Sequence, residues 1–229
     1  MNQMLRIDGF SMSLDGYGAG PDQSLANPLG VGAEPLHDWI FATRTFADRF
    51  GMDGRGEGID DGFVRAQFTD IGASIMGRNM FGPVRGPWAG EETWNGWWGE
   101  DPPYHHPVFV LTNHPREPVE MDGGTTFHFV TGGIEEARQR ALAAAEGKDV
   151  WIGGGISTIR QYLRAGLIDR IHLAVIPTLL GSGERLLDDI AGPDGSIPYY
   201  EPTGMTAGEN AVHIQLARAE PEHGQQPSA

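Results

Sequence analysis

The sequence contains no cysteine, and its 229 residues include only 16 Lys and Arg against 31 Asp and Glu. The missing thiols exclude thiolate catalysis, disulfides and metal sites with Cys ligands. The formal net charge of −15 repels phosphate backbones and anionic lipids, so we expect neither nucleic acid nor a membrane as a partner. No stretch approaches the ~18 apolar residues of a membrane span, and residues 1–6 lack the apolar core of a signal peptide. We therefore expect a soluble, cytoplasmic protein.

Apolar side chains are frequent enough for a packed core. They make up 39% of the chain, with six Trp and ten Phe, which argues against disorder. The length allows one substantial domain. We predict a single domain over residues 1–220, with a glycine-rich insert at 51–62 and a flexible tail at 221–229.

Strands and helices are predicted to alternate through the middle of the chain, and the chain then finishes in a hairpin. This order favours an α/β fold whose sheet is parallel in its centre and antiparallel at one edge. The expected strands are 5–13, 73–76, 108–112, 127–130, 150–152 and 168–178, followed by the hairpin strands 203–207 and 211–218; the expected helices begin at Pro35, at about Asp61, at Ile134 and after Gly155.

The run Val150–Ile152 ends at three glycines, and apolar residues at helical spacing follow. This is the pattern of a buried strand, a turn without side chains and the start of a helix, whose first N–H groups favour anions. The alternative is a tight strand-to-helix turn with no ligand. The run is neither a GxGxxG motif nor a P-loop. The phosphate-binding candidates are Gly153, Gly154, Gly155, Ile156, Ser157 and Thr158.

Two further strand ends carry groups that bind anions. Gly77, Arg78 and Asn79 follow one strand, and Thr112, Asn113 and His114 follow another, with Arg116 close behind. Ligands of open α/β sheets bind at the carboxyl ends of strands, so the three ends point to one phosphate-bearing ligand. The alternative for Arg78 is a surface arginine bound to carbonyl groups.

The order strand–Met-Gly-Arg, strand–Thr-Asn-His and strand–Gly-Gly-Gly–helix resembles the dihydrofolate reductase superfamily. It is most similar to the branch with the C-terminal reductase domain of riboflavin biosynthesis, a bacterial deaminase-reductase family. The segments 13–17 and 176–183 support that branch, and the resemblance extends over about residues 5–219. It implies a three-layer α/β/α sandwich with a mixed, mostly parallel sheet, and a homodimer.

By this resemblance the cofactor is NADPH. Gly77, Arg78 and Asn79 would contact its phosphates, Thr112–His114 would lie beside the 2′-phosphate, and Gly153–Thr158 would hold the pyrophosphate and approach the nicotinamide. The side chains of Arg78, His114 and Arg116 could neutralise the extra phosphate, which favours NADPH over NADH.

The substrate end is less defined. Asp15 and Asp38 are the candidate catalytic carboxylates; the alternatives are an Asp-Gly turn for Asp15 and an exposed carboxylate at a helix N-terminus for Asp38. Trp94, Trp97 and Trp98 could wall a flat substrate or cover the core or a dimer interface. The histidines have no spacing that indicates a metal site. The candidate substrate contacts are Ser13, Tyr17, Trp39, Leu180 and Gly181.

These observations favour an NADPH-dependent reductase that transfers a hydride directly to a small heterocyclic or carbonyl substrate, as a pyrimidine reductase does, without metal or flavin. The absence of cysteine argues against an attached zinc deaminase. Two alternatives stay open: a folate reductase that uses Asp38, and an inactive NADPH-binding sensor or partner protein.

Overall fold

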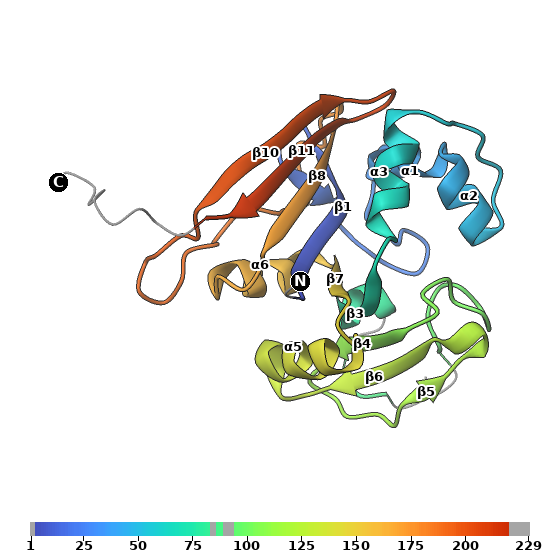
Figure 1. The fold of residues 1–229 in the computed structure, drawn as a ribbon, viewed down its shortest axis with the longest axis vertical. Helices are drawn as coiled ribbons and strands as arrows, with labels where there is room; N and C mark the ends of the chain where they lie inside the picture. Colours follow the sequence, from blue (N-terminus) through green and yellow to red (C-terminus); the bar gives the residue numbers. More distant parts are fainter. Residues whose placement is uncertain (1–2, 83–85, 89–93, 220–229) are drawn as a thin grey trace.

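A mixed sheet of nine strands runs through the part of the chain described in this computed structural model, residues 3–82, 86–88 and 94–219 (Figure 1). The strand order is β10-β11-β8-β1-β7-β3-β4-β6-β5, and a separate two-stranded sheet pairs β2 with β9. The strands are β1 (Leu5–Ser13), β2 (Tyr17–Ala19), β3 (Ile71–Gly77), β4 (Pro107–Leu111), β5 (Val119–Glu120), β6 (Thr126–Val130), β7 (Asp149–Gly154), β8 (Arg170–Ile176), β9 (Glu184–Arg185), β10 (Tyr200–Ala207) and β11 (Val212–Arg218).

The six central strands of the large sheet, β8, β1, β7, β3, β4 and β6, are parallel, and the antiparallel pairs lie at its edges. At one edge, the hairpin β10–β11 pairs with β8. At the other, β5 pairs with β6. This confirms the predicted α/β fold with a mostly parallel centre and an antiparallel C-terminal hairpin.

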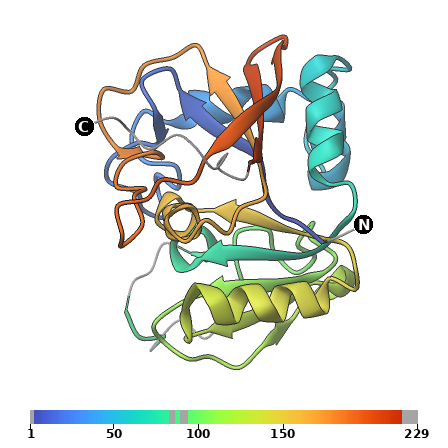
Figure 2. The ribbon, with the colours of Figure 1, turned by 60° about the vertical axis from the view of Figure 1, so that its left-hand side comes forward.

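Helices cover both faces of the sheet, as Figures 1 and 2 show. Alternate residues of one strand enter different cores, since successive side chains of a strand point to opposite faces. On β8, Leu173 packs into the core beneath α5 and α6, and Ala174 packs into the core beneath α1 to α3. The helices are η1 (Glu34–His37, 3-10), α1 (Asp38–Phe41), α2 (Arg44–Phe50), α3 (Ile59–Gln67), α4 (Arg78–Phe81), η2 (Asp122–Gly124, 3-10), α5 (Gly133–Ala144) and α6 (Ile156–Arg164).

The single helix predicted from Pro35 is instead three short pieces, η1, α1 and α2. Thr43 has an extended backbone, and its side chain accepts a hydrogen bond from the Phe46 N–H, so it starts a new helix. Strands β2, β5 and β9 were not predicted, because each has only two or three residues.

The glycine-rich stretch 51–62 is hydrogen-bonded to neighbouring segments. Gly56 accepts a hydrogen bond from the Arg44 N–H at 2.9 Å, and α3 already begins at Ile59. The Glu209 carboxylate in the β10–β11 turn accepts from the N–H groups of Ile59 and Asp60 and so caps α3. Within the described residues, no helix is long and apolar enough to cross a membrane. The predicted tail, 221–229, lies outside the described residues.

Candidate active site

A cavity of about 940 Å³ opens at the carboxyl ends of the central strands. Residues from β1, β3, β4, β6 and β7 line it, together with the starts of α4 and α6 and the segment η1 to α3. A volume of this size suits a drug-sized ligand or larger. Its position at the strand ends is the one that the sequence predicted.

The ends of β3 and β7 meet at Gly77. A Cβ added at Gly77 would lie only 2.3 Å from the Thr158 Oγ1, so a larger residue would displace the Thr158 side chain or the start of α6. Gly155 is the N-cap of α6, with no side-chain capping bond, and its carbonyl accepts from Thr158 N–H at 3.0 Å. The N-terminus of α6 therefore lies directly beside the β3 end, which is the arrangement that an anion-binding site needs.

The end of β4, at Thr112–His114, lies beside Arg78, whose guanidinium packs on the indole ring of Trp88. The Arg78 guanidinium carbon lies 3.0 Å from the ring centre of Trp88, and the Trp88 Nε1–H donates to the His114 carbonyl at 2.8 Å. Thr112 is buried, and its Oγ1 accepts from the His114 N–H at 3.1 Å. Arg78 and the Thr112–His114 turn thus belong to one assembly, and the cation–π contact orients the guanidinium.

Arg116 packs on the same indole as Arg78 but does not line the cavity. Its guanidinium donates to the Trp94 carbonyl at 2.7 Å and to the Asn95 Oδ1 at 2.9 Å. Its guanidinium carbon lies 4.9 Å from the Trp88 ring centre, against 3.0 Å for Arg78.

The structure brings nearly all predicted cofactor residues together. Only Gly154 is absent from the cavity lining; it is buried at the end of β7, where its peptide bond to Gly155 is cis. The predicted cofactor residues that line the cavity are Gly77, Arg78, Asn79, Thr112, Asn113, His114, Gly153, Gly155, Ile156, Ser157 and Thr158.

Asp15 does not line the cavity. Its carboxylate accepts from the Ser13 hydroxyl at 2.6 Å and from the N–H groups of Leu180 and Gly181 at 3.1 and 2.8 Å. These bonds, the Ser13 hydroxyl first among them, lower the pKa of Asp15 to about 2. The Ser13 hydroxyl also accepts from Tyr17 N–H. These bonds form a clasp between the segments 13–17 and 180–181. The five predicted residues in these segments lie outside the cavity lining: Ser13, Asp15, Tyr17, Leu180 and Gly181.

Asp38 is exposed and lies outside the cavity lining, whereas the preceding residue His37 lines it. Positions 37, 40 and 41 share one helix face, and His37, Ile40 and Phe41 all line the cavity. Asp38 is one residue out of phase with that face. Trp39 is buried in the core and donates to the Ser11 hydroxyl at 2.8 Å. The structure therefore places neither Asp38 nor Trp39 at the cavity.

A series of aromatic rings lines a further part of the cavity, and of these rings the sequence indicated Trp98 alone as a possible wall of the site. Phe46 and Phe50 stack with centroids 4.0 Å apart, and Phe50 meets Trp98 edge-on at 4.4 Å. Phe68 lies 6.2 Å from both Phe50 and Trp151. We call this region the aromatic lobe; its rings are Phe41, Phe46, Phe50, Phe68, Trp98 and Trp151.

Polar side chains also line this part of the cavity, among them Asp8, Glu34, His37 and Gln67. Burial lowers the pKa of His37 to about 4, so its imidazole is neutral at pH 7. Burial raises the pKa of Asp8 to about 6, although Arg6 Nε lies 2.9 Å from its carboxylate. The Gln67 Oε1 lies 2.2 Å from where a Cβ on Gly9 would be, and Gly9 has a φ of 67°. No periodic pattern in the sequence indicates these residues.

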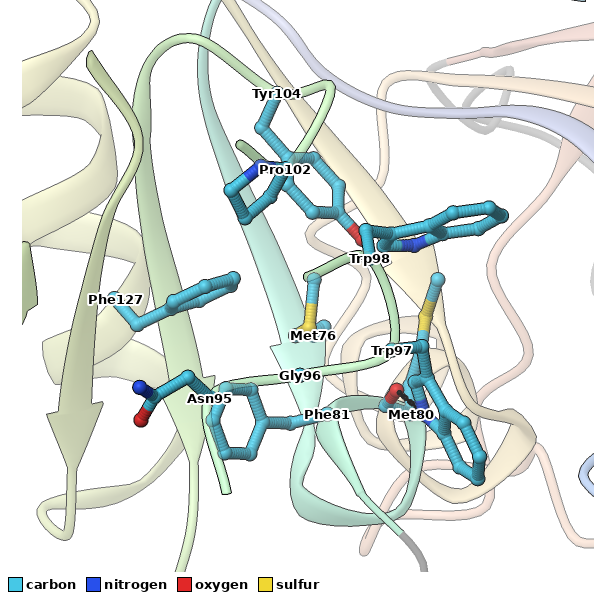
Figure 3. Close-up of a pocket in the computed structure, with 10 residues that line it drawn as sticks. All are labelled: Met76, Met80, Phe81, Asn95, Gly96, Trp97, Trp98, Pro102, Tyr104 and Phe127. Carbon is cyan, nitrogen blue, oxygen red and sulfur yellow. Dashed lines mark hydrogen bonds between the residues drawn. The ribbon is translucent and has the colours of Figure 1, made fainter. Parts of the chain in front are cut away.

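Trp97 and Trp98 line the cavity, and Trp94 packs beside the core of β4 and β6. Figure 3 shows the segment from Asn95 to Tyr104 crossing β3, with the Trp97 indole bound to the Met80 carbonyl at 3.0 Å. Burial raises the pKa of Tyr104 to about 12, and its hydroxyl points to Trp98. Trp97 and Trp98 therefore fit the interpretation as a cavity wall, and Trp94 fits the interpretation as part of the core.

Among the residues that the structure describes, no three His, Asp or Glu side chains form a group that could hold a metal ion. The cavity combines strand ends whose groups suit an anion with a set of aromatic rings. Such a site can hold a phosphate-bearing cofactor against a flat second molecule.

Comparison with known proteins gives a consistent family. Residues 7–213 match the family model described as RibD C-terminal domain. The uncharacterized protein YyaP of Bacillus subtilis is 30% identical over 97 residues, which span 40% of this chain and 50% of that protein. This chain therefore matches about half the length of that curated relative.

Solved structures share the fold. The putative riboflavin biosynthesis protein of Shewanella sp. PV-4 aligns with a TM-score of 0.59 at 22% identity, over 96% of this chain and all of that one. The deaminase/5-amino-6-(5-phosphoribosylamino)uracil reductase of Thermotoga maritima aligns with a TM-score of 0.53 at 10% identity, over 95% of this chain and 57% of that one. A pyrimidine reductase-like protein of Corynebacterium diphtheriae has a TM-score of 0.51 at 14% identity, over 96% and 92%.

Proposed function

Because this chain belongs to the RibD C-terminal domain family, we propose that it is an NADPH-dependent reductase acting on a small heterocyclic or carbonyl substrate. One observation carries the proposal: three strand ends, at Gly77–Asn79, Thr112–His114 and Gly153–Thr158, line a single cavity. The T. maritima protein, which shares the fold, is named as a reductase of a phosphoribosylaminouracil.

The residues present fit NADPH. Gly77 lets the backbone and α6 approach each other with no side chain between them. Ser157 and Thr158 add hydroxyl donors at the first turn of α6, where the helix dipole favours negative charge. Arg78 supplies a cation on the opposite side of this space, beside Thr112–His114.

In the mechanism, these residues bind and orient. Arg78, Asn79 and the Thr112–His114 turn hold phosphate groups, and Gly153 and Gly155 form a wall without side chains beside the reacting ring. When bound, NADPH supplies the hydride. The aromatic lobe holds the acceptor flat, so that the two reactants meet in a fixed orientation. No observation favours folate reduction, since Asp38 lies outside the cavity lining.

The test is a titration of the purified protein with NADPH and NADH, followed by the fluorescence of the reduced nicotinamide. We expect tighter binding of NADPH. Arg78→Ala should weaken NADPH by about tenfold or more, because a charged hydrogen bond is lost, and should weaken NADH much less. Arg55→Ala is the control, since that side chain is 80% exposed.

Absence of NADPH binding by the unmodified protein would overturn the proposal. An equal loss of affinity for NADPH and NADH in Arg78→Ala would show that Arg78 does not bind the 2′-phosphate. Oxidation of NADPH with candidate pterins, aminopyrimidines and quinones separates an enzyme from an inactive sensor. The homodimer stays a prediction, which light scattering of the purified protein can check.

A further inference from the structure

The aromatic lobe is a connected set of rings on the cavity wall. Its rings come from α1, α2, the residue after α3, the loop before β4, and β7, and each ring contacts at least one other. His37 continues the series, since its ring stacks on Phe41 at 6.0 Å. Trp151 joins the lobe to the cofactor end, because it precedes Gly153 by two residues on β7 and both line the cavity. A planar molecule in the lobe would therefore lie next to the expected nicotinamide position.

The charge of the lobe is unusual for a phosphate-binding site. Among the described residues that line the cavity, Arg78 is the one Arg or Lys side chain, and it lies at the cofactor end. The lobe side instead presents the carboxyl groups of Glu34 and of Asp8, the latter paired with Arg6 Nε at 2.9 Å. Arg49 is near, with its guanidinium 4.5 Å from the Phe68 ring centre, but it donates to the carbonyls of Pro103 and Tyr104 and does not line the cavity. A phosphate or sulfonate in the lobe would meet aromatic faces and acids.

Two buried polar groups in the lobe have hydrogen-bonding capacity to spare. Neither His37 Nδ1 nor Gln67 Oε1 has a hydrogen-bond partner among the described residues, although both atoms are buried. Buried polar atoms are paired in almost all proteins, and exceptions point to a missing ligand or water. Since the imidazole of His37 is neutral at pH 7, this pair recognises uncharged donors and acceptors rather than anions.

We infer, on the basis of the proposed reductase function, that the substrate is a planar, uncharged, conjugated compound without a phosphate group, stacked in the aromatic lobe and hydrogen-bonded to His37 and Gln67. Quinones and unphosphorylated nitrogen heterocycles have this chemistry. Reduction adds a hydride, taken from NADPH as it becomes NADP⁺, to one carbon of the conjugated system. A proton from water goes to the attached oxygen or nitrogen, so atoms and charge balance.

The experiment measures binding rather than turnover, with NADP⁺ present so that no reduction occurs. Quenching of tryptophan fluorescence reports the lobe, because Trp98 and Trp151 form part of it. The probes are two pairs that differ only in an anionic group: 1,2-naphthoquinone against 1,2-naphthoquinone-4-sulfonate, and riboflavin against its 5′-phosphate. We expect at least one uncharged member to bind about tenfold or more tighter than its anionic partner, which corresponds to about 1.4 kcal/mol.

Variants then test the residues. His37→Phe keeps a ring and removes both nitrogens, and Gln67→Leu removes the amide at nearly constant volume. Each should weaken the uncharged probe by about tenfold, the worth of one hydrogen bond, while the affinity for NADPH stays unchanged. Gln139→Leu on the exposed face of α5 is the matched control.

The inference would be overturned if the anionic probe of each pair bound as tightly as its uncharged partner, or more tightly. It would also be overturned if none of the four probes bound. Normal uncharged-probe binding in both variants would remove His37 and Gln67 from recognition. Failure of the unmodified protein to bind NADPH would instead contradict the proposed reductase function. A failure of the inferred substrate class can therefore be told apart from a failure of the proposed function.

Discussion

His172 Nε2 lies 3.0 Å from His213 Nδ1 in the buried space between β8, β11 and α3. The chain of bonds continues at both ends. The Gly9 N–H lies 3.1 Å from His172 Nδ1, and His213 Nε2 lies 2.8 Å from Asp60 Oδ1. The Gly9 N–H can only donate, so His172 Nδ1 accepts; His172 Nε2–H then donates to His213, and His213 Nε2–H donates to Asp60. One tautomer of each ring therefore satisfies the whole chain, which ends at the cavity wall at Gly9.

Removing the final acceptor should destabilise the fold. Asp60 also accepts from the backbone and side-chain nitrogens of Asn210 at 2.9 and 3.1 Å. Asp60→Ala leaves these donors and the His213 Nε2–H without a partner, and we expect a loss of ~3 kcal/mol in the free energy of unfolding. Urea denaturation measures it. Asp48→Ala, at an exposed carboxylate, should change the free energy by less than ~0.5 kcal/mol. A similar small change in both variants would show that the chain of bonds does not stabilise the protein.

Acid should destabilise the protein between about pH 6.5 and 4. Burial lowers the pKa of His172 to about 3 and the pKa values of His37 and His106 to about 4, from 6.5. In this window the unfolded chain binds more protons than the folded one, so stability falls as the pH falls, by roughly 1 kcal/mol per pH unit for each histidine. Asp8 opposes this, since its raised pKa of about 6 favours the folded state as the pH falls from 6 to 3.8.

Urea titrations at pH 7.5, 6 and 5 measure the effect. We expect a net loss, because three histidines outweigh one carboxyl group. His106→Gln should make the loss shallower, since the amide can replace the imidazole in the bond to the Ser74 hydroxyl, which is 2.7 Å long. Stability that is constant from pH 7.5 to 5 would contradict the lowered histidine pKa values.

The alternation of strands and helices and the three strand ends that line the cavity could be predicted from the sequence, because each is a local pattern. Val150–Ile152 followed by glycines contains the strand, the turn and the helix start within nine residues. The aromatic lobe could not be predicted in this way. Phe50, Phe68 and Trp98 come from three separate segments, and only the tertiary fold brings their rings to 4.4 and 6.2 Å.

Helix phase explains the failure at Asp38. The sequence shows a carboxylate at the start of a helix, but the face that meets the cavity depends on how α1 packs on β8 and β1. Trp39 and Ile40 are buried, and this orientation turns His37 toward the cavity and Asp38 toward solvent. A shift of one residue thus changes which side chain reaches the site.

Asp15 should control the mobility of the loop at residues 180–181 rather than the chemistry. Asp15→Ala removes the acceptor of both loop N–H groups, so we expect faster hydrogen exchange at Leu180 and Gly181. Asp15→Asn keeps one acceptor oxygen and should show an intermediate rate. Asp188→Ala is the control, since Asp188 is exposed in the same region. Unchanged hydrogen exchange in Asp15→Ala would show that the clasp does not hold this loop. If the variant lost substrate binding without a change in exchange, Asp15 would instead belong to the substrate site.

The contact between Gly77 and Thr158 should be visible as coupling between two substitutions. A Cβ at position 77 would lie 2.3 Å from the Thr158 Oγ1, so Gly77→Ala must displace Thr158 or the start of α6. We expect the single variant to weaken NADPH binding by about tenfold and to lower the free energy of unfolding by ~1–3 kcal/mol, as overpacking does. Thr158→Ala removes the clashing hydroxyl, so the double variant should lose less than the sum of the two single variants. Nicotinamide fluorescence and urea denaturation give both quantities for the four proteins. Strict additivity would contradict the close approach of the β3 end and α6 on which the cofactor site depends.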